Sequence, residues 1–492
     1  MASRFTALPL SSGESFILET DHGGKRWVIL VDGGQSKLEG PTKNGLYKAV
    51  REHCPEITDT IDIAICTHRD HDHAGGFPAF IKTWLAEGND IGEFWLPGGW
   101  AGAVEYALTN PDRLASMLHE GANAAAYEIG RRQRAIDKEI QPMGVRPTRE
   151  GAFRSIQSML HDQYAEAEVS TDGQTKVFSA GDGDRRISDL EGIRRTTRAA
   201  NSWGFSEDDW EIIRSDLETS ELHAEPLTER AKVFEQFQAG MVVFESRSGE
   251  GNTYRRYRGF EDSSEDNQLA RSLFRSSLDT AEAIREISSA AAMFDIPVRW
   301  FDFPEFEKGA LPSGGLAGFL KPLNAVELTQ VRRETDAKFM FFKLTLTEQN
   351  VASLVFQRVE TDDEPGVLFL GDSRLAFGID RPVGDFDNHL VQPDRPVVYT
   401  AAHHGSRNND HAYKMLGKWL AALFDESIAV RNGGVWNQTL SRFLGVTNRR
   451  CAQCYQCHGS GWSQLVQINT DGRDWSWPAD QGGKCGVPKR KM

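Results

Sequence analysis

The chain has 492 residues and a formal net charge of −15, with 39% hydrophobic and 26% charged residues. This composition is typical of a globular protein, and the length predicts either one large domain with an insertion or several units. The negative charge argues against a protein that coats duplex DNA, although an enzyme acting on nucleic acid needs only a local basic groove. No apolar run reaches the roughly 18 residues that span a bilayer and no export signal is recognisable, which predicts a cytoplasmic protein that does not bind membranes.

Short apolar, β-branched runs predict a set of buried strands. Three of them, at residues 27–31, 61–66 and 367–370, end abruptly in polar or glycine-containing turns. A fourth, at residues 396–400, is followed shortly by His403-His404-Gly405-Ser406. A further run, 355–359, is separated from 367–370 by the turn-rich residues 362–366, which predicts a hairpin. Because a rigid sheet aims the loops at its strand ends toward one place, polar residues that follow these runs are candidates for a site.

Between residues 101 and 294 the pattern changes to Ala, Glu, Arg and Leu at helical spacing, over 111–141, 149–169 and 264–293. We therefore expect a mostly helical insertion at 101–294 within a domain formed by residues 1–100 and 295–492. Such an insertion is a candidate surface for a protein partner.

The segment 67–76, which reads T-H-R-D-H-D-H-A-G-G, places three His and two Asp within six residues. The segment follows a predicted strand directly, so these side chains can converge on a cation. Mixed imidazole and carboxylate ligands suit zinc, with manganese and iron as alternatives. The sequence therefore predicts a metal site here.

These residues resemble the metallo-β-lactamase superfamily, whose pattern is H-x-H-x-D-H, and within it the hydrolase domain of ComEC competence proteins. The ComEC-like version, H-x-D-x-D-H-x-G-G, matches His68, Asp70, Asp72, His73, Gly75 and Gly76. Further matches follow in the order of the family: Asp32 in L-V-D-G-G, the segment 350–355, Gly371-Asp372, and His403-His404-Gly405-Ser406. The likeness covers about residues 1–100 and 295–480.

The resemblance implies an α/β fold of the metallo-β-lactamase type, an αββα sandwich, with one or two Zn²⁺ ions and Mn²⁺ as an alternative. It implies that His68 and Asp70 hold one ion and that Asp72 and His73 hold the other. One of His403 and His404 would complete the second set, and Asp372 would bridge the two ions. Asp32 would orient the His-bearing loop from behind.

Catalytic and substrate-binding roles are assigned on the same basis. Asp72, His403 and His404 are the predicted catalytic residues, and whichever of the two histidines is not a ligand could protonate the leaving group. Asn350, where many members of the superfamily carry a further His ligand, is a candidate for substrate binding. Ser406 and Arg407 suit an anionic substrate, since Arg can hold a phosphate with two hydrogen bonds.

Near the C-terminus, C-x-x-C-x-x-C-H comprises Cys451, Cys454, Cys457 and His458. The alternatives are a structural zinc site, an iron–sulfur cluster completed by Cys485, c-type haem attachment, and reduced thiols in a turn before a strand at 463–468. A structural zinc is the preferred metal site. Cys54 and Cys66 are predicted to be buried thiols.

The leading functional hypothesis is a metal-dependent phosphodiesterase that acts on an anionic phosphoester, or a nuclease if that substrate is nucleic acid. Two alternatives stay open. One is the hydrolysis of a small lactam, lactone or thioester. The other is a regulated sensor or binding protein whose helical insertion recognises a partner.

Overall fold

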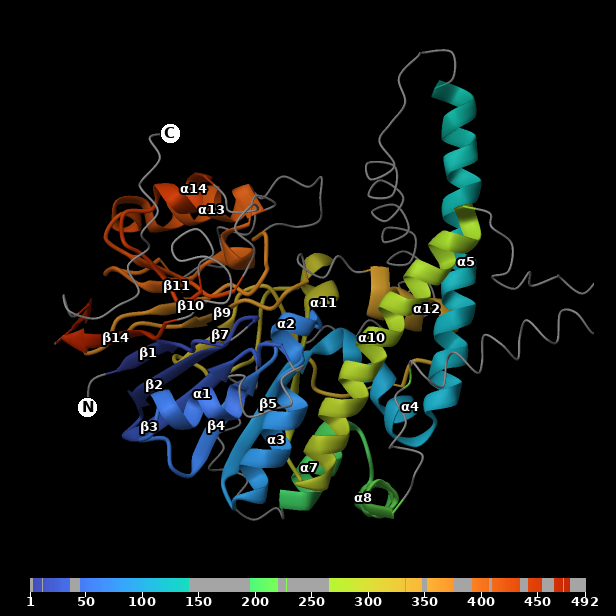
Figure 1. The fold of residues 1–492 in the computed structure, drawn as a ribbon, viewed down its shortest axis with the longest axis horizontal. Helices are drawn as coiled ribbons and strands as arrows, with labels where there is room; N and C mark the ends of the chain where they lie inside the picture. Colours follow the sequence, from blue (N-terminus) through green and yellow to red (C-terminus); the bar gives the residue numbers. More distant parts are fainter. Residues whose placement is uncertain are drawn as a thin grey trace, which may run out of the picture.

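The computed structural model describes residues 3–10, 12–35, 45–140, 195–219, 227, 265–331, 333–346, 352–375, 392–406, 409–433, 441–453, 464–471 and 473–477. Within these ranges the protein belongs to the α/β class, with helices packed on two mixed sheets (Figure 1).

The first sheet contains nine strands in the described residues, in the order β15-β14-β1-β2-β3-β4-β5-β6-β8. Their bounds are β1 Arg4–Ala7, β2 Phe16–His22, β3 Lys25–Val31, β4 Thr60–Ile65, β5 Asp90–Pro97, β6 Val298–Asp302, β8 Val326–Glu327, β14 Val466–Asp471 and β15 Asp474–Ser476. Strands β3 to β6 run parallel, so their carboxyl ends lie at the same edge of the sheet.

The second sheet has six strands in the described part of the chain, in the order β13-β12-β11-β10-β9-β7. Their bounds are β7 Leu320–Pro322, β9 Phe356–Arg358, β10 Val367–Phe369, β11 Val398–Thr400, β12 Ile428–Arg431 and β13 Arg449–Cys451. Strands β10 to β13 are parallel, which again collects their carboxyl ends at one edge.

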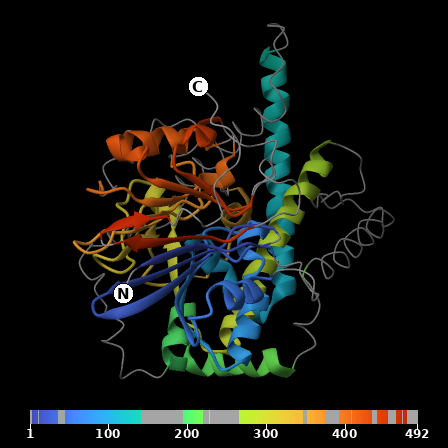
Figure 2. The same ribbon diagram turned by 60° about the vertical axis from the view of Figure 1, so that its left-hand side comes forward.

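Helices cover the outer faces of both sheets. Those beside the first sheet are α1 Leu46–His53, α3 Phe77–Ala86, α4 Val104–Thr109, α5 Pro111–Ile140, α7 Arg195–Trp203, α8 Glu207–Thr219 and α10 Glu265–Met293. Those beside the second are α11 Phe303–Glu307, α13 Asp410–Leu420 and α14 Ser441–Gly445. The described residues also include the short helices α2 His71–Ala74, η1 Gly98–Ala103, α12 Ala337–Phe341, η5 Phe342–Leu346, η7 Ala402–Gly405 and η9 Ala421–Phe424. Figure 2 shows the two sheets layered between these groups of helices.

Three clusters of buried apolar side chains hold the layers together. One lies between the sheets and joins residues such as Phe5 and Trp95 of the first sheet to Phe356 and Phe369 of the second. A second cluster joins the outer face of the first sheet to its helices, and the third does the same for the second sheet. Burial of apolar surface on both faces of each sheet explains why the strands read as nearly continuous apolar runs.

The strands predicted at 27–31, 61–66, 367–370 and 396–400 are confirmed as β3, β4, β10 and β11, each to within two residues at either end. The hairpin is also confirmed, because β9 pairs antiparallel with β10. The strand predicted at 463–468 corresponds to β14, which begins three residues later than predicted and extends to Asp471.

The described part of residues 101–294 is helical. The predicted helices at 111–141 and 264–293 are confirmed as α5 and α10, which lie side by side in Figures 1 and 2 and pack against each other. The helix predicted at 149–169 lies outside the described residues. No helix in the described ranges combines the length and apolar character needed to cross a membrane.

A buried ion pair connects the two sheets away from the site. The guanidinium of Arg358 on β9 lies 2.9 Å from a carboxylate oxygen of Glu364 and also donates to Thr20 Oγ1 of β2. We expect Arg358→Met to lower the free energy of unfolding by about 3–5 kcal/mol, because it leaves the Glu364 charge buried without its partner. Urea denaturation measures the change.

The matched control is the double variant Arg358→Met, Glu364→Gln, which removes both charges and should recover part of the lost stability. A double variant no more stable than Arg358→Met would contradict this explanation.

Candidate metal centre

Loops at the carboxyl ends of parallel strands in both sheets form the candidate site. Asp32 follows β3 and the loop from His68 to His73 follows β4, at one edge of the first sheet. Asp372 follows β10 and the His403-His404 pair follows β11, at the facing edge of the second sheet. The predicted residues, more than 300 positions apart in the sequence, are thereby brought together.

The backbone at this site is held in unfavourable conformations. Asp32, His403 and His404 have φ values of 60°, 49° and 50°, in the left-handed region that side-chain-bearing residues seldom occupy. Each costs about 1–3 kcal/mol and persists only where the surroundings enforce it. Only glycine fits at Gly371 (φ 48°), because a Cβ there would lie 2.4 Å from Ser353 Oγ. Such strain is common at functional sites.

One carboxylate oxygen of Asp372 faces the first set of predicted ligands. Asp372 Oδ2 lies 3.6 Å from His68 Nε2 and 3.5 Å from His403 Nε2. His68 Nε2 is in turn 3.6 Å from Asp70 Oδ2. This side of Asp372 therefore gathers His68, Asp70 and His403.

The other oxygen faces the second set. Asp372 Oδ1 lies 3.3 Å from His73 Nε2 and 3.9 Å from His404 Nε2. His404 Nε2 is also 3.1 Å from Asp72 Oδ2. Asp372 thus stands between two groups of potential ligands, with one oxygen toward each.

The remaining ring nitrogens of the histidines have partners that fix the rings. His73 Nδ1 donates to Asp32 Oδ2 at 2.8 Å, and His404 Nδ1 donates to the backbone carbonyl of Asn432 at 2.8 Å. In each case the acceptor fixes a proton on Nδ1, so the lone pair of the neutral ring lies on Nε2, the atom that points at Asp372. His68 Nδ1 lies 3.0 Å from Thr67 Oγ1, which also contacts Asp32. Such partners behind the ligands orient metal-binding histidines.

Several atoms at the centre are buried and make no hydrogen bond in the described part of the protein: Nε2 of His68, Nε2 of His73 and Oδ1 of Asp372. An unsatisfied buried polar atom costs about 1–3 kcal/mol, so three converging on one place indicate a missing binding partner. Two sets have ligand atoms within 4.8 Å of one another: Glu14, His73, Asp372 and His404, and His68, Asp70 and Asp372. These residues can hold a metal ion.

Glu14, which the sequence did not indicate, is fully buried at this site. Its carboxylate oxygens lie 3.5 Å from His404 Nδ1 and 3.7 Å from His73 Nδ1, on the side of the rings away from Asp372. Its backbone N–H donates to the carbonyl of Asp72 at 2.9 Å, which ties the turn between β1 and β2 to the metal loop. Glu14 therefore lies behind two candidate ligands, and within the described residues neither of its carboxylate oxygens makes a hydrogen bond.

The charges of the cluster shift one another's pKa values. Burial raises the pKa of the Asp372 carboxyl, but His73 and His404 outweigh it and hold that pKa well below its ordinary value. Burial lowers the pKa of His404, but Glu14 and Asp372 raise it well above the ordinary value. The pKa of Glu14 is raised, mainly by burial. Unlike His404, His403 has a lowered pKa, because burial outweighs the attraction of Asp372.

Two further side chains, which sequence reasoning did not single out, position Asp372. Ser353 Oγ accepts a hydrogen bond from the Asp372 backbone N–H at 3.0 Å. Asn409 Nδ2 donates to the carbonyls of Asp372 and Ser373, at 2.9 and 3.0 Å. Ser353 lies within the segment 350–355 that matched the family pattern, which is the one sequence signal that pointed to it.

Some of the other predicted site residues lie in the described part of the chain and the rest lie outside it. Ser406 is buried at the end of the His403-His404 turn, with its N–H bonded to the His403 carbonyl. Asn350 and Arg407 lie outside the described residues. So do Cys454, Cys457 and His458, and the structural zinc site stays a prediction. Cys451 is buried at the end of β13, and the predicted burial of Cys54 and Cys66 is confirmed.

Comparison with known proteins adds no relative: no family model, curated protein or solved structure matches this chain.

Proposed function

We propose that the chain is a metal-dependent hydrolase of the metallo-β-lactamase type, with an αββα sandwich, and that it cleaves phosphodiesters. The observation that carries the proposal is the position of Asp372, which presents one oxygen to His68 and the other to His73. A carboxylate between two such sets could hold a cation on each side, and a pair of cations would supply the charge stabilisation needed for displacement at phosphorus. The order of layers, helices on two stacked sheets, supports the fold assignment.

The chain's own residues would hold the cations, orient the histidine ligands and protonate the leaving group. His68 and Asp70 would hold one cation, His73, His404 and Asp72 the other, and Asp372 both. Zn²⁺ or Mn²⁺ in these positions supplies Lewis acidity and lowers the pKa of bound water to roughly 7. Asp32 and the Asn432 carbonyl keep the lone pairs of His73 and His404 aimed at Asp372.

His403 is the residue proposed to protonate the leaving group. Its side chain is 19% exposed against 8% for His404, so it is the more accessible to a substrate. Its Nε2 lies near Asp372 on the side of His68, within reach of a phosphoester bound between the two ligand sets. An imidazole there can hold a proton at Nε2 and pass it to the departing oxygen.

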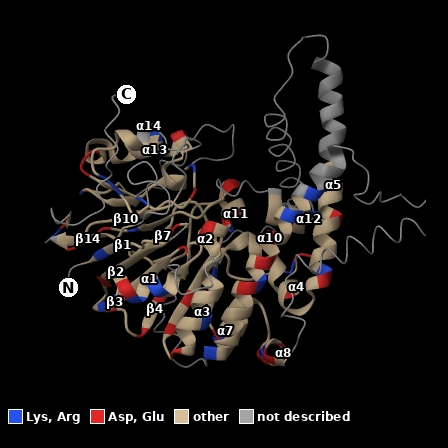
Figure 3. Cartoon of the chain, viewed as in Figure 1, with Lys and Arg blue, Asp and Glu red and all other residues tan. Residues whose placement is uncertain are grey.

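The distribution of charge favours a small phosphoester over a long polyanion. Along α10, Arg271, Arg275 and Arg285 lie among Asp279, Glu282 and Glu286 (Figure 3), and the chain as a whole carries a net charge of −15. Nucleic-acid enzymes gather basic residues along the path of the backbone. A nuclease is therefore the second form of this proposal, and single-stranded DNA, duplex DNA and RNA belong in its test.

The test combines metal analysis with an assay panel. The protein supplied with Zn²⁺ or Mn²⁺ should hydrolyse bis(4-nitrophenyl) phosphate, and the Asp72→Ala, His73→Ala double variant should lose at least one ion per chain. The panel adds nucleic acids, a lactam and a thioester. Lactam turnover without phosphodiester cleavage would overturn the substrate class. Unchanged metal content in the double variant would overturn the site.

A further inference from the structure

A hollow lies directly beside the His68 side of the metal centre. His68 forms part of its wall, and the carboxyl ends of β5 and β6 supply most of the rest, from Pro97 to Trp100 and from Phe301 to Pro304. In the parallel part of the first sheet, β4 lies beside β5 and β5 beside β6. The metal loop after β4 and the hollow at the ends of β5 and β6 are therefore adjacent along the same edge of the sheet. A group attached to a substrate held by His68 therefore has this space next to it.

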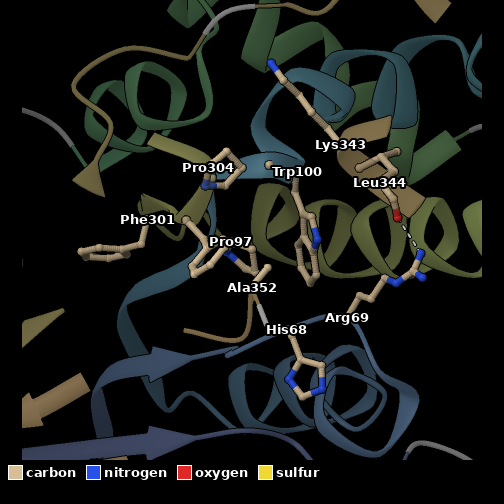
Figure 4. A pocket seen from close by; sticks show the side chains of 12 residues that line it. His68, Arg69, Pro97, Trp100, Phe301, Pro304, Lys343, Leu344 and Ala352 are labelled. Atoms are coloured by element: carbon tan, nitrogen blue, oxygen red, sulfur yellow. Dashed lines mark hydrogen bonds between the residues drawn. The ribbon is translucent and has the colours of Figure 1, made fainter. Parts of the chain in front are cut away.

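The wall is largely apolar. Figure 4 shows the Trp100 indole extending toward His68, with Pro97 and Ala352 on one side and Leu344 on the other. Phe301, Phe303 and Pro304 also line the hollow, and the Phe301 ring points away from it toward Trp95 and Phe356 between the sheets. The space amounts to about 50 Å³ and is partly open to solvent.

The two cationic side chains in the wall are already engaged elsewhere. Arg69 donates to the carbonyls of Ser276 and Leu344 and also contacts Thr280, so helix α10 and the η5 segment take up its hydrogen bonds. The ammonium of Lys343 lies 3.3 Å from Glu334 Oε2. A charged or strongly polar substrate group would find few partners in the hollow, whereas an apolar one would gain from leaving water.

We propose that this hollow binds a planar apolar ring carried on the phosphoryl group of the substrate, so that the enzyme acts on aryl- or base-bearing phosphoesters. The inference rests on the proposed phosphoester hydrolysis and names its substrate class. The Trp100 indole, which is 4% exposed, reaches this wall beside Pro97 and Leu344, and an aromatic edge as well as a face makes a favourable contact with a ring. His68 in the wall places that ring next to the phosphorus.

Gly99 gives a way to fill the hollow without disturbing the backbone. It lines the space, and a Cβ added there would meet only the Lys343 carbonyl, at an ordinary 3.6 Å. Its neighbour Gly98 differs, since a Cβ there would lie 2.7 Å from the side chain of Asp302. Gly99→Leu therefore adds a side chain to the hollow, and Trp100→Leu is the second variant, which removes the indole but keeps an apolar wall.

The experiment measures binding, so it does not depend on turnover. Isothermal titration calorimetry on the Zn²⁺-loaded protein compares methylphosphonate with phenylphosphonate, which differ only in the apolar group. We expect phenylphosphonate to bind at least 10-fold more tightly, a difference of about 1.4 kcal/mol. In Gly99→Leu and Trp100→Leu that preference should fall to about twofold or less, while methylphosphonate binding stays unchanged.

The matched control is Gly417→Leu on α13, outside the hollow, where an added Cβ meets no atom within 4 Å and so is tolerated as it is at Gly99. It should keep the full preference. Thymidine 5′-thiophosphate distinguishes a nucleobase from an aryl group. If it binds more tightly than phenylphosphonate, and if Gly99→Leu abolishes that binding, the ring is a nucleobase. If it binds more weakly than phenylphosphonate, the ring is that of an aryl ester.

Equal binding of the two phosphonates, a preference that survives Gly99→Leu, or binding of neither would overturn the proposed ring site. These results are distinct from failure of the proposed function. If the protein cleaves phosphodiesters but shows no ring preference, only the proposed ring site is wrong. If it shows a ring preference that depends on Gly99 but cleaves no phosphodiester, only the proposed reaction is wrong.

Discussion

Asp372→Asn is expected to lower phosphodiester turnover by more than about 10³-fold, equivalent to roughly 4 kcal/mol of transition-state stabilisation. The reason is the position of the carboxylate, whose Oδ1 and Oδ2 face different histidines at 3.3–3.6 Å. An amide offers one oxygen and no charge, so it cannot neutralise and hold a cation on each side. Turnover number and metal content per chain are measured together, and both should fall.

The control is Asp363→Asn, an exposed aspartate in the turn between β9 and β10, which should leave both quantities unchanged. If Asp372→Asn kept two ions per chain and turned over within tenfold of the unmodified protein, Asp372 would not be the bridge.

The strands that carry the site were predictable because burial leaves a strong local signal. β4 and β10 are covered on both faces, and strands of this kind read as short apolar runs that stop at a polar turn. Periodicity does not tell which strands are neighbours. The pairing of β6 with β5, across 200 intervening residues, depends on packing that no local pattern encodes.

Part of the candidate site was predictable for a related reason. His68, Asp70, Asp72 and His73 form a dense cluster that has few uses apart from metal binding, and Asp372 and the His403-His404 turn follow predicted strands. The sequence could not distinguish His403 from His404. That distinction comes from the turn itself, which directs His404 Nδ1 to the Asn432 carbonyl and leaves His403 nearer to solvent.

Glu14 illustrates what the sequence leaves out. It stands alone in a small turn, S-S-G-E-S, between two apolar strands, where a glutamate normally faces water. Its burial depends on Gly13, whose φ of 83° and missing Cβ let the turn approach the Asp72 carbonyl. A single glutamate becomes informative only when the strands on either side are known to end at the metal loop.

His403→Ala and His404→Ala are both expected to lower activity, but for different reasons. His404 is buried, its Nδ1 is fixed by Asn432, and its Nε2 faces Asp372 and Asp72, so its removal should reduce the metal content by about one ion per chain. His403→Ala should spare the metal and lower turnover roughly 10²–10⁴-fold, the usual contribution of a general acid. Elemental analysis and steady-state kinetics separate the two effects, with His53→Ala at the end of α1 as the matched control.

A second comparison tests the role of His403 directly. A nitrophenolate leaving group needs little protonation, so His403→Ala should lower the turnover of a nitrophenyl ester far less than that of an alkyl ester. Loss of metal in His403→Ala, or equal losses on both esters, would instead make His403 a third ligand on the His68 side of Asp372.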